Sequence, residues 1–336
     1  MNAGVQTLIR EVIITDDVEA AHPDPTVMSR APFQLQPKPA WLRIRMAGGP
    51  NISRIKGLIQ EDGLNTVCQE ARCPNQAKCF SQGTATFLLM GSRCTRNCTF
   101  CAVSSGSPEP LDTEEPKRVA EAIRKMGIRY AVLTSVTRDD LRDGGADHFR
   151  QTVLAIKEQA PDTLVECLIP DFQGREESYR CVVDSRPEVI NHNVETVPRL
   201  YARVRPGADY QRSLSLLNFF RKQVPEVMTK SGVMVGLGEE EKELLAVMKD
   251  LRNQGCRLLT IGQYLQPNPR SHPVRRYVPP AEFAAWAERA CEMGFAGVAS
   301  GPLVRSSYEA GGLYRQALAE NKGRLREKAA FISLTK

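Results

Sequence analysis

The sequence has no long apolar run. No stretch approaches the ~18 consecutive apolar residues that a membrane-spanning helix needs. The first twenty residues carry Glu11, Asp16, Asp17 and Glu19 and have no apolar core of the kind that a secretory signal contains. We therefore expect a cytoplasmic protein with no membrane partner.

Aromatic residues and histidines are also scarce. Aromatics make up 6% of the 336 residues, and no basic, aromatic-bearing module of the kind that binds RNA stands out. The net charge of +6 is spread along the chain, so it favours acidic protein partners without specifying nucleic acid. We expect no nucleic-acid partner. Only four histidines occur, and none lies between residues 23 and 147.

Cysteine, in contrast, is plentiful and clustered. Without export, ten cysteines do not predict a disulfide framework, and clustered thiols in such a chain more often bind metal. Cys94, Cys98 and Cys101 form a C-x3-C-x2-C run, with Phe100 before the last thiol, directly after the apolar segment 84–91. Three thiols are one ligand short of a structural zinc site. They suit a cubane iron–sulfur cluster with one open iron; a zinc site or a set of buried thiols is the alternative.

A second trio, Cys68, Cys73 and Cys79, has the spacing C-x4-C-x5-C. No neighbouring histidine can complete a Cys3His zinc site, although a fourth ligand from a distant part of the chain remains possible. Two trios within residues 68–101 indicate two separate metal centres. The single cysteines are interpreted as small buried hydrophobes, namely Cys167, Cys181, Cys256 and Cys291.

From residue 83 onward, apolar strands alternate with amphipathic helices. The predicted strands span 84–90, 129–136, 163–169, 187–193, 227–236 and 257–265, and the predicted helices span 114–126, 146–159, 175–184, 209–223, 239–254 and 281–293. Near-continuous apolar strands separated by helices predict an α/β fold with a parallel sheet. Six such units predict a partial (β/α)6 barrel of the TIM type, followed by a strand-like segment at 295–300 and a charged helical tail on the outside.

This pattern divides the chain into four parts. We expect a flexible extension at 1–31, a wrapping segment with the second cysteine trio at 32–82, the barrel at 83–294 and a C-terminal segment at 295–336. Polar residues follow several predicted strands, among them Ser135, Asn191, Asn193, Glu195 and Lys230. Barrel active sites lie at the carboxyl ends of the strands, so these residues and the first cysteine trio are expected on one face.

The C-x3-C-x2-C motif with its aromatic residue resembles the signature of the radical S-adenosylmethionine (SAM) family. The resemblance implies that Cys94, Cys98 and Cys101 hold a [4Fe-4S] cluster whose open iron binds SAM. It also implies a radical SAM type of barrel. By analogy, Ser135, Asn191, Asn193 and Glu195 are candidate SAM contacts. His192 either orients a reacting group or is structural, and Lys230 either pairs with the SAM carboxylate or lies solvated at the rim.

Both cysteine spacings together resemble those members of this family that insert sulfur to make lipoyl groups. The same similarity runs through 134–141, 191–196, 234–239, 263–267 and 301–308, and covers roughly 32–311. It implies that Cys68, Cys73 and Cys79 hold an auxiliary [4Fe-4S] cluster, with a serine of the Arg305–Tyr308 motif on its fourth iron. That serine is assigned as Ser307, with Ser306 the near alternative, and Arg305 is taken as catalytic.

The implied reaction is sulfur insertion at C6 and C8 of an octanoyl group on a protein lysine, with the auxiliary cluster as sulfur donor. These carbons carry no acidic hydrogen, so radical chemistry suits them. The implied partners are octanoylated lipoyl-carrier domains (2-oxoacid dehydrogenase E2 subunits and the glycine cleavage H protein), a flavodoxin- or ferredoxin-type electron donor and an iron–sulfur cluster carrier. The alternatives are a radical SAM sulfurtransferase that acts on a tRNA base or a biotin precursor, and a zinc-stabilised binding protein without catalysis.

Overall fold

The structure is a computed structural model that describes residues 37–43, 57, 63–67, 73, 75, 79 and 85–320. The predicted extension at 1–31, Cys68 and the residues after 320 lie outside the described residues. Among the described helices, none is long and apolar enough to cross a membrane.

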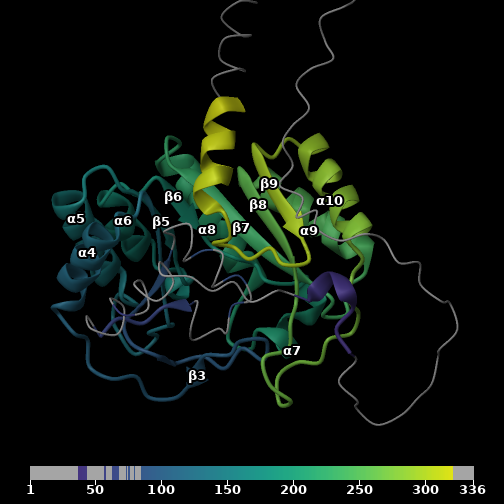
Figure 1. Cartoon of the computed structure of the whole chain (residues 1–336), viewed down its shortest axis with the longest axis horizontal. Helices are drawn as coiled ribbons and strands as arrows, with labels where there is room; N and C mark the ends of the chain where they lie inside the picture. Colours follow the sequence, from purple (N-terminus) through teal and green to yellow (C-terminus); the bar gives the residue numbers. More distant parts are fainter. Residues whose placement is uncertain are drawn as a thin grey trace, which may run out of the picture.

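A seven-stranded parallel sheet forms the centre of the molecule (Figure 1). Its strands, in spatial and sequence order, are β1 (Thr86–Leu89), β4 (Tyr130–Ser135), β5 (Leu164–Leu168), β6 (Val189–Asn191), β7 (Met228–Val235), β8 (Leu258–Gln263) and β9 (Gly297–Gly301). All six predicted strands are present, and the strand-like segment after them is β9. A short second sheet pairs β2 (Arg93–Cys94) with β3 (Ser104–Ser105) in parallel.

Helices connect successive strands, as the alternation predicted. They are α4 (Glu115–Met126), α5 (Ala146–Gln159), α6 (Glu176–Asp184), α7 (Tyr201–Val204), α8 (Tyr210–Gln223), α9 (Glu241–Asn253) and α10 (Pro280–Glu292). α4 ends where Gly127 adopts the left-handed conformation (φ 65°), which glycine accepts without steric cost. Six β/α units followed by β9 make the partial TIM-type barrel that the sequence predicted.

The strand side chains pack on two faces. Outward-facing residues such as Leu133, Val165 and Ile261 are fully buried in one cluster with the covering helices. The single cysteines Cys167 and Cys256 are fully buried in this cluster, as predicted, and burial raises the pKa of the Cys256 thiol to about 12. Cys181 and Cys291 were predicted to be buried too, but they are only half-buried at the edge of the cluster.

The inner face of the sheet is covered by residues from far along the chain. Residues 310–320 form a helix, drawn in yellow, that lies against the inner side of the sheet (Figure 1). Its Leu313 and Ala317 are fully buried with Val189, Met228 and Leu258. The prediction that the helical tail packs on the outside was therefore wrong for its described part, because its apolar stripe fills the inner face.

Candidate active site

A cavity of about 530 Å³ lies at the carboxyl ends of the strands. Its polar and sulfur-bearing walls come from both ends of the described chain: Lys38, Cys73, Cys94, Arg96, Cys98, Cys101, Ser135, Asn193, Glu195, Arg205, Arg305, Ser306 and Ser307. The first cysteine trio shares this lining with Ser135, Asn193 and Glu195, as predicted, whereas the predicted Asn191 and Lys230 do not line the cavity. Of the second trio, Cys73 lines the cavity, whereas Cys79 is buried beside Val304 and Tyr308.

The loop that carries the first trio is anchored by its backbone. The N–H of Thr95 donates to the carbonyl of Thr137, just after β4, at 3.0 Å, and the Thr95 hydroxyl donates to the same carbonyl at 2.9 Å. On the other side, the N–H of Thr99 donates to the carbonyl of Val204 in α7 at 3.0 Å. These bonds fix the loop between the ends of the sheet and α7 before any ligand is considered.

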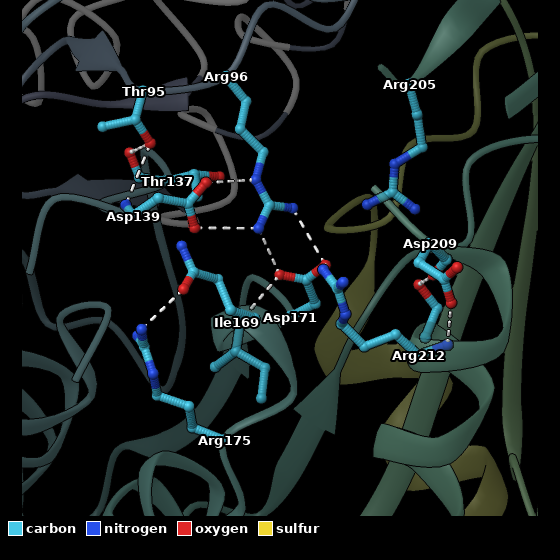
Figure 2. A network of polar contacts seen from close by, with 12 residues as sticks. Thr95, Arg96, Thr137, Asp139, Ile169, Asp171, Arg175, Arg205, Asp209 and Arg212 are labelled. Carbon is cyan, nitrogen blue, oxygen red and sulfur yellow. Dashed lines mark hydrogen bonds and ion pairs between the residues drawn. The ribbon is translucent and has the colours of Figure 1, made fainter. Parts of the chain in front are cut away.

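Arg96, inside the cysteine motif, joins this loop to two carboxylates (Figure 2). Its guanidinium lies 2.7 Å from Asp139 and 2.6 Å from Asp171, and Arg212 reaches Asp171 at 3.2 Å. Burial alone would raise the pKa of Asp171, but the hydrogen bonds and charge of Arg96 outweigh it and hold the pKa below its ordinary value. Paired and hydrogen-bonded charges tolerate burial, so this cluster is a rigid attachment for the loop.

Backbone N–H groups point at the thiols of the loop. Cys94 Sγ accepts from Thr137 at 3.3 Å and from Arg96 at 3.4 Å, and Cys101 Sγ accepts from Val103 at 3.4 Å. Burial raises the pKa of Cys101 to about 11, and burial also raises the pKa of Cys98 against the lowering charge of Arg205. Such thiols become thiolates by binding metal, and N–H bonds to cluster sulfurs tune the reduction potential.

The donor set of the trio, three thiols, is one that a [4Fe-4S] cluster with an open iron can use. Among the described residues, no three Cys, His, Asp or Glu side chains converge on one metal ion. A cubane binds each cysteine through a different iron and does not require such convergence.

Buried polar atoms without partners indicate where a polar ligand fits. Ser135 Oγ, Asn193 Oδ1 and Arg205 Nε have no hydrogen-bond partner within the described structure, and all three residues line the cavity. Buried polar groups are normally hydrogen-bonded. The backbone of Gly232 lies close to Asn193 and Thr260: a Cβ added at Gly232 would lie 2.8 Å from Asn193 Oδ1 and 2.6 Å from Thr260 Oγ1. These features fit a ligand as polar as SAM.

Glu195 and Arg205 are half-buried side chains of opposite charge on the same wall of the cavity. Glu195 has a left-handed backbone (φ 64°) and accepts a bond from the Asn193 amide at 3.1 Å. Burial raises the pKa of Glu195, and the charge of Arg205 opposes that rise. Arg205 donates to the Asn193 carbonyl at 3.0 Å and to the Tyr201 hydroxyl at 3.2 Å. Sequence reasoning missed Arg205 and Arg96; for Arg96, its position inside the cysteine motif was an available signal.

Asn191 and Lys230 lie below the cavity, not on its wall. Lys230 is fully buried, with Nζ 2.9 and 3.1 Å from the two carboxylate oxygens of Glu166. Asn191 donates to Glu166 at 2.8 Å, and so does the Tyr130 hydroxyl. Neither interpretation of Lys230 was right: it is not at the rim, and its partner is Glu166. Asn193 reaches the cavity because it lies two residues beyond Asn191, one period along the strand direction.

The contacts of His192 are those of a structural residue. Its Nδ1 lies 2.8 Å from the Ile169 carbonyl and its Nε2 3.0 Å from the Ser213 hydroxyl. Burial lowers its pKa to about 4, so the ring is neutral near pH 7. Of the two roles left open for His192, the structure favours the structural one.

The serine motif lies against the segment of the second trio. The Asn75 amide donates to the Leu303 carbonyl at 2.6 Å, and the N–H of Cys79 donates to the Asn75 carbonyl at 2.9 Å. Arg305 is half-buried, and the loss of solvation lowers its pKa, while the Cys73 thiol acts in the opposite direction. Cys73 and both serines of the motif thus meet at one cavity, although the motif lies more than 200 residues farther along the chain.

The barrel and the cysteine loop define a radical SAM enzyme: the model of the Radical SAM superfamily matches residues 88–251. A solved structure, SuiB of Streptococcus suis bound to precursor peptide SuiA, shares the fold with a TM-score of 0.50 and 10% identity over 65% of this chain and 48% of that one. The chain belongs to the lipoyl synthase family. It is 53% identical to lipoyl synthase of Alkaliphilus metalliredigens (83% of this chain, 96% of that protein) and 56% identical to that of Caldanaerobacter subterraneus (81% and 95%).

Family membership establishes the cofactors and the class of chemistry. The chain is a radical SAM sulfur-inserting enzyme that uses SAM and [4Fe-4S] clusters, one of them auxiliary.

Proposed function

We propose that this chain inserts sulfur at C6 and C8 of an octanoyl group held on a lysine of a lipoyl-carrier domain. The observation that supports this most is that Cys73, Ser307 and the trio Cys94, Cys98 and Cys101 line the same cavity. A substrate bound in this cavity would therefore lie close to the residues that would hold both clusters.

The two clusters have separate ligand sets in this proposal. Cys94, Cys98 and Cys101 hold the SAM-binding cluster, and Cys68, Cys73, Cys79 and Ser307 hold the auxiliary one. An alkoxide is a hard ligand for a cluster iron and is lost more easily than a thiolate, which suits a cluster that gives up sulfur. The half-buried guanidinium of Arg305 lies near Cys73 and would offset the negative charge of the thiolates.

Residues of the cavity wall would orient SAM. When bound, SAM and its cluster supply a radical able to remove hydrogen from an unactivated carbon. Ser135 Oγ, Asn193 Oδ1 and Arg205 Nε are available to bond its polar groups, and Glu195 accepts bonds from the same side of the cavity. The left-handed backbone of Glu195 fixes the direction of its carboxylate.

Apolar side chains form a further part of the wall and suit an acyl chain. Leu88, Phe100, Leu168, Met234 and Val304 all line the cavity. Apolar walls exclude water, which protects reactive intermediates from side reactions, and they favour a saturated eight-carbon chain over a polar substrate such as a nucleic-acid base.

The partners and the division of the chain are part of the same proposal. Octanoylated E2 subunits and the H protein would present the substrate, and a cluster carrier would restore the spent auxiliary cluster. Residues 32–82 and 295–336 would complete the active site over the barrel at 83–294, and the protein would act in the cytoplasm.

The experiment uses reconstituted, anaerobic protein with SAM, dithionite and an octanoyl-lysine peptide, and measures 5′-deoxyadenosine and peptide mass. We expect a dithiolane product from the native chain. Ser307→Ala should abolish that product while retaining 5′-deoxyadenosine, and Ser306→Ala is the matched control. Full product yield from Ser307→Ala would refute the serine assignment. Absence of both products with the native chain, with zinc in place of iron and sulfide, would refute the enzyme proposal.

A further inference from the structure

The cysteine loop has an outer side that faces away from the cavity. Thr99, between Cys98 and Cys101, contacts two other segments there: its hydroxyl donates to the Arg203 carbonyl at 2.8 Å, and its carbonyl accepts from the N–H of His272 at 2.8 Å. The two segments are α7 and the loop after β8, which both lie at the lower edge of the molecule in Figure 1. Both are therefore fixed to the part of the chain that holds the cluster.

These two segments carry exposed positive charge without compensation. Arg203, Arg270 and Arg275 are exposed, and within the described residues none of them forms an ion pair. Their neighbours differ, since Arg199 pairs with Glu243 at 2.7 Å and Arg276 with Glu282 at 2.7 Å.

Arg203 and Arg275 lie close enough to His272 for their charges to act on it, and Arg270 lies two residues before it in the same loop. Burial lowers the pKa of His272, and the charges of Arg203 and Arg275 lower it further. Glu239, whose charge opposes this lowering, already accepts hydrogen bonds from the backbone N–H groups of residues 236, 237 and 238. We call Arg203, Arg270 and Arg275 the arginine surface.

We propose that the arginine surface docks an acidic one-electron donor protein of the flavodoxin or ferredoxin type. The proposal rests on the proposed function, because it needs a cluster at Cys94, Cys98 and Cys101. One electron leaves the donor's reduced cofactor and enters this cluster through the Thr99 side of the loop for each SAM that is cleaved; the donor is oxidised by one electron and the cluster reduced by one.

The position of the surface favours an electron donor over an octanoylated carrier. None of the three arginines lines the cavity within the described residues. A carrier must insert its acyl chain into the cavity, whereas electron transfer requires only proximity to the cluster. Redox partner proteins bind each other weakly through small interfaces. Opposite charges on the two proteins raise their association rate, and salt reduces this effect.

The test compares a protein donor with a chemical one. In the variant Arg203→Glu/Arg270→Glu/Arg275→Glu, 5′-deoxyadenosine formation driven by enzymatically reduced flavodoxin should fall at least about tenfold at low salt. With dithionite it should stay within about twofold of the native rate, because dithionite needs no docking site. The Arg203 backbone carbonyl that holds Thr99 is retained. Lys222→Glu, on an exposed site near the end of α8, changes charge in the same direction at the opposite end of the barrel and should have no effect.

Three outcomes decide the proposal. A native flavodoxin-driven rate in the triple variant would overturn it, and so would an equal loss with dithionite, which would indicate a role in folding or cluster retention. A raised KM for an octanoylated carrier under dithionite, with the flavodoxin-driven rate unchanged, would overturn it in favour of carrier docking. Failure of the proposed function has a different signature, because the native chain would then yield no dithiolane product with dithionite.

Discussion

Replacing Lys230 with methionine tests whether this lysine stabilises the barrel or contacts SAM. Its ammonium lies 2.9 Å from Glu166 Oε1, and both side chains are fully buried. Lys230→Met leaves a buried carboxylate without its cation, a change that costs about 3–5 kcal/mol in other proteins. At roughly 2–4 °C per kcal/mol for a domain of this size, the apparent Tm should fall by roughly 6–20 °C.

A second variant separates loss of the charge pair from loss of packing. Lys230→Met/Glu166→Gln removes both charges and leaves an amide that can still bond the Tyr130 hydroxyl and the Asn191 amide. Replacing a buried ion pair as a unit is often close to neutral, so the double variant should recover most of the lost Tm. The measurement is thermal unfolding by circular dichroism under anaerobic conditions, with SAM affinity measured on the same samples.

A single variant that unfolds at the native temperature but binds SAM at least tenfold more weakly would contradict this role. Lys230 would then face the ligand and not Glu166. Equal destabilisation of the single and double variants would also contradict it, because the cost would then arise from lost packing alone.

Three further predictions concern the cavity and its loop. Asp171→Asn weakens the buried attachment of Arg96. The iron bound after reconstitution should therefore fall by up to about half, which is the share of one of two clusters. A native iron content would show that the attachment is dispensable. Gly232→Ala places a Cβ 2.8 Å from Asn193 Oδ1. It should weaken SAM binding about tenfold with little change in Tm. Calorimetric titration measures the SAM affinity, and a native affinity would contradict the prediction. The pKa of His192 is about 4 in the folded chain and 6.5 when the side chain is free. Between these two values the folded chain keeps His192 neutral, whereas the unfolded chain binds a proton. The contribution of His192 to stability should therefore decline as pH falls below about 6.5 and stay level above it. A His192→Gln variant with an unchanged Tm–pH slope between pH 7.5 and 5.5 would contradict that account.

The fold was largely predictable because strand and helix periods are local properties of the sequence. Strands β4 and β8, for example, were predicted at 129–136 and 257–265 and observed at Tyr130–Ser135 and Leu258–Gln263. The placement of the first cysteine trio at the strand ends followed from the same alternation, because it comes directly after β1.

Contacts between distant segments were not predictable in this way. The partner of Lys230 lies 64 residues earlier, and Arg96 finds its carboxylates 43 and 75 residues later. No periodicity encodes such distances. The helix at 310–320 was misplaced for a related reason: its apolar stripe predicts burial, but the surface that receives it exists only once the sheet has curved.

Residues 303–320 have a consequence for the order of events in biosynthesis. They supply the serine wall of the cavity and cover the inner side of the sheet, with Leu313 and Ala317 packed against strands β6, β7 and β8. All seven strands leave the ribosome before this segment does. The auxiliary cluster proposed above therefore cannot gain its serine ligand until this segment has been synthesised and has packed against the sheet.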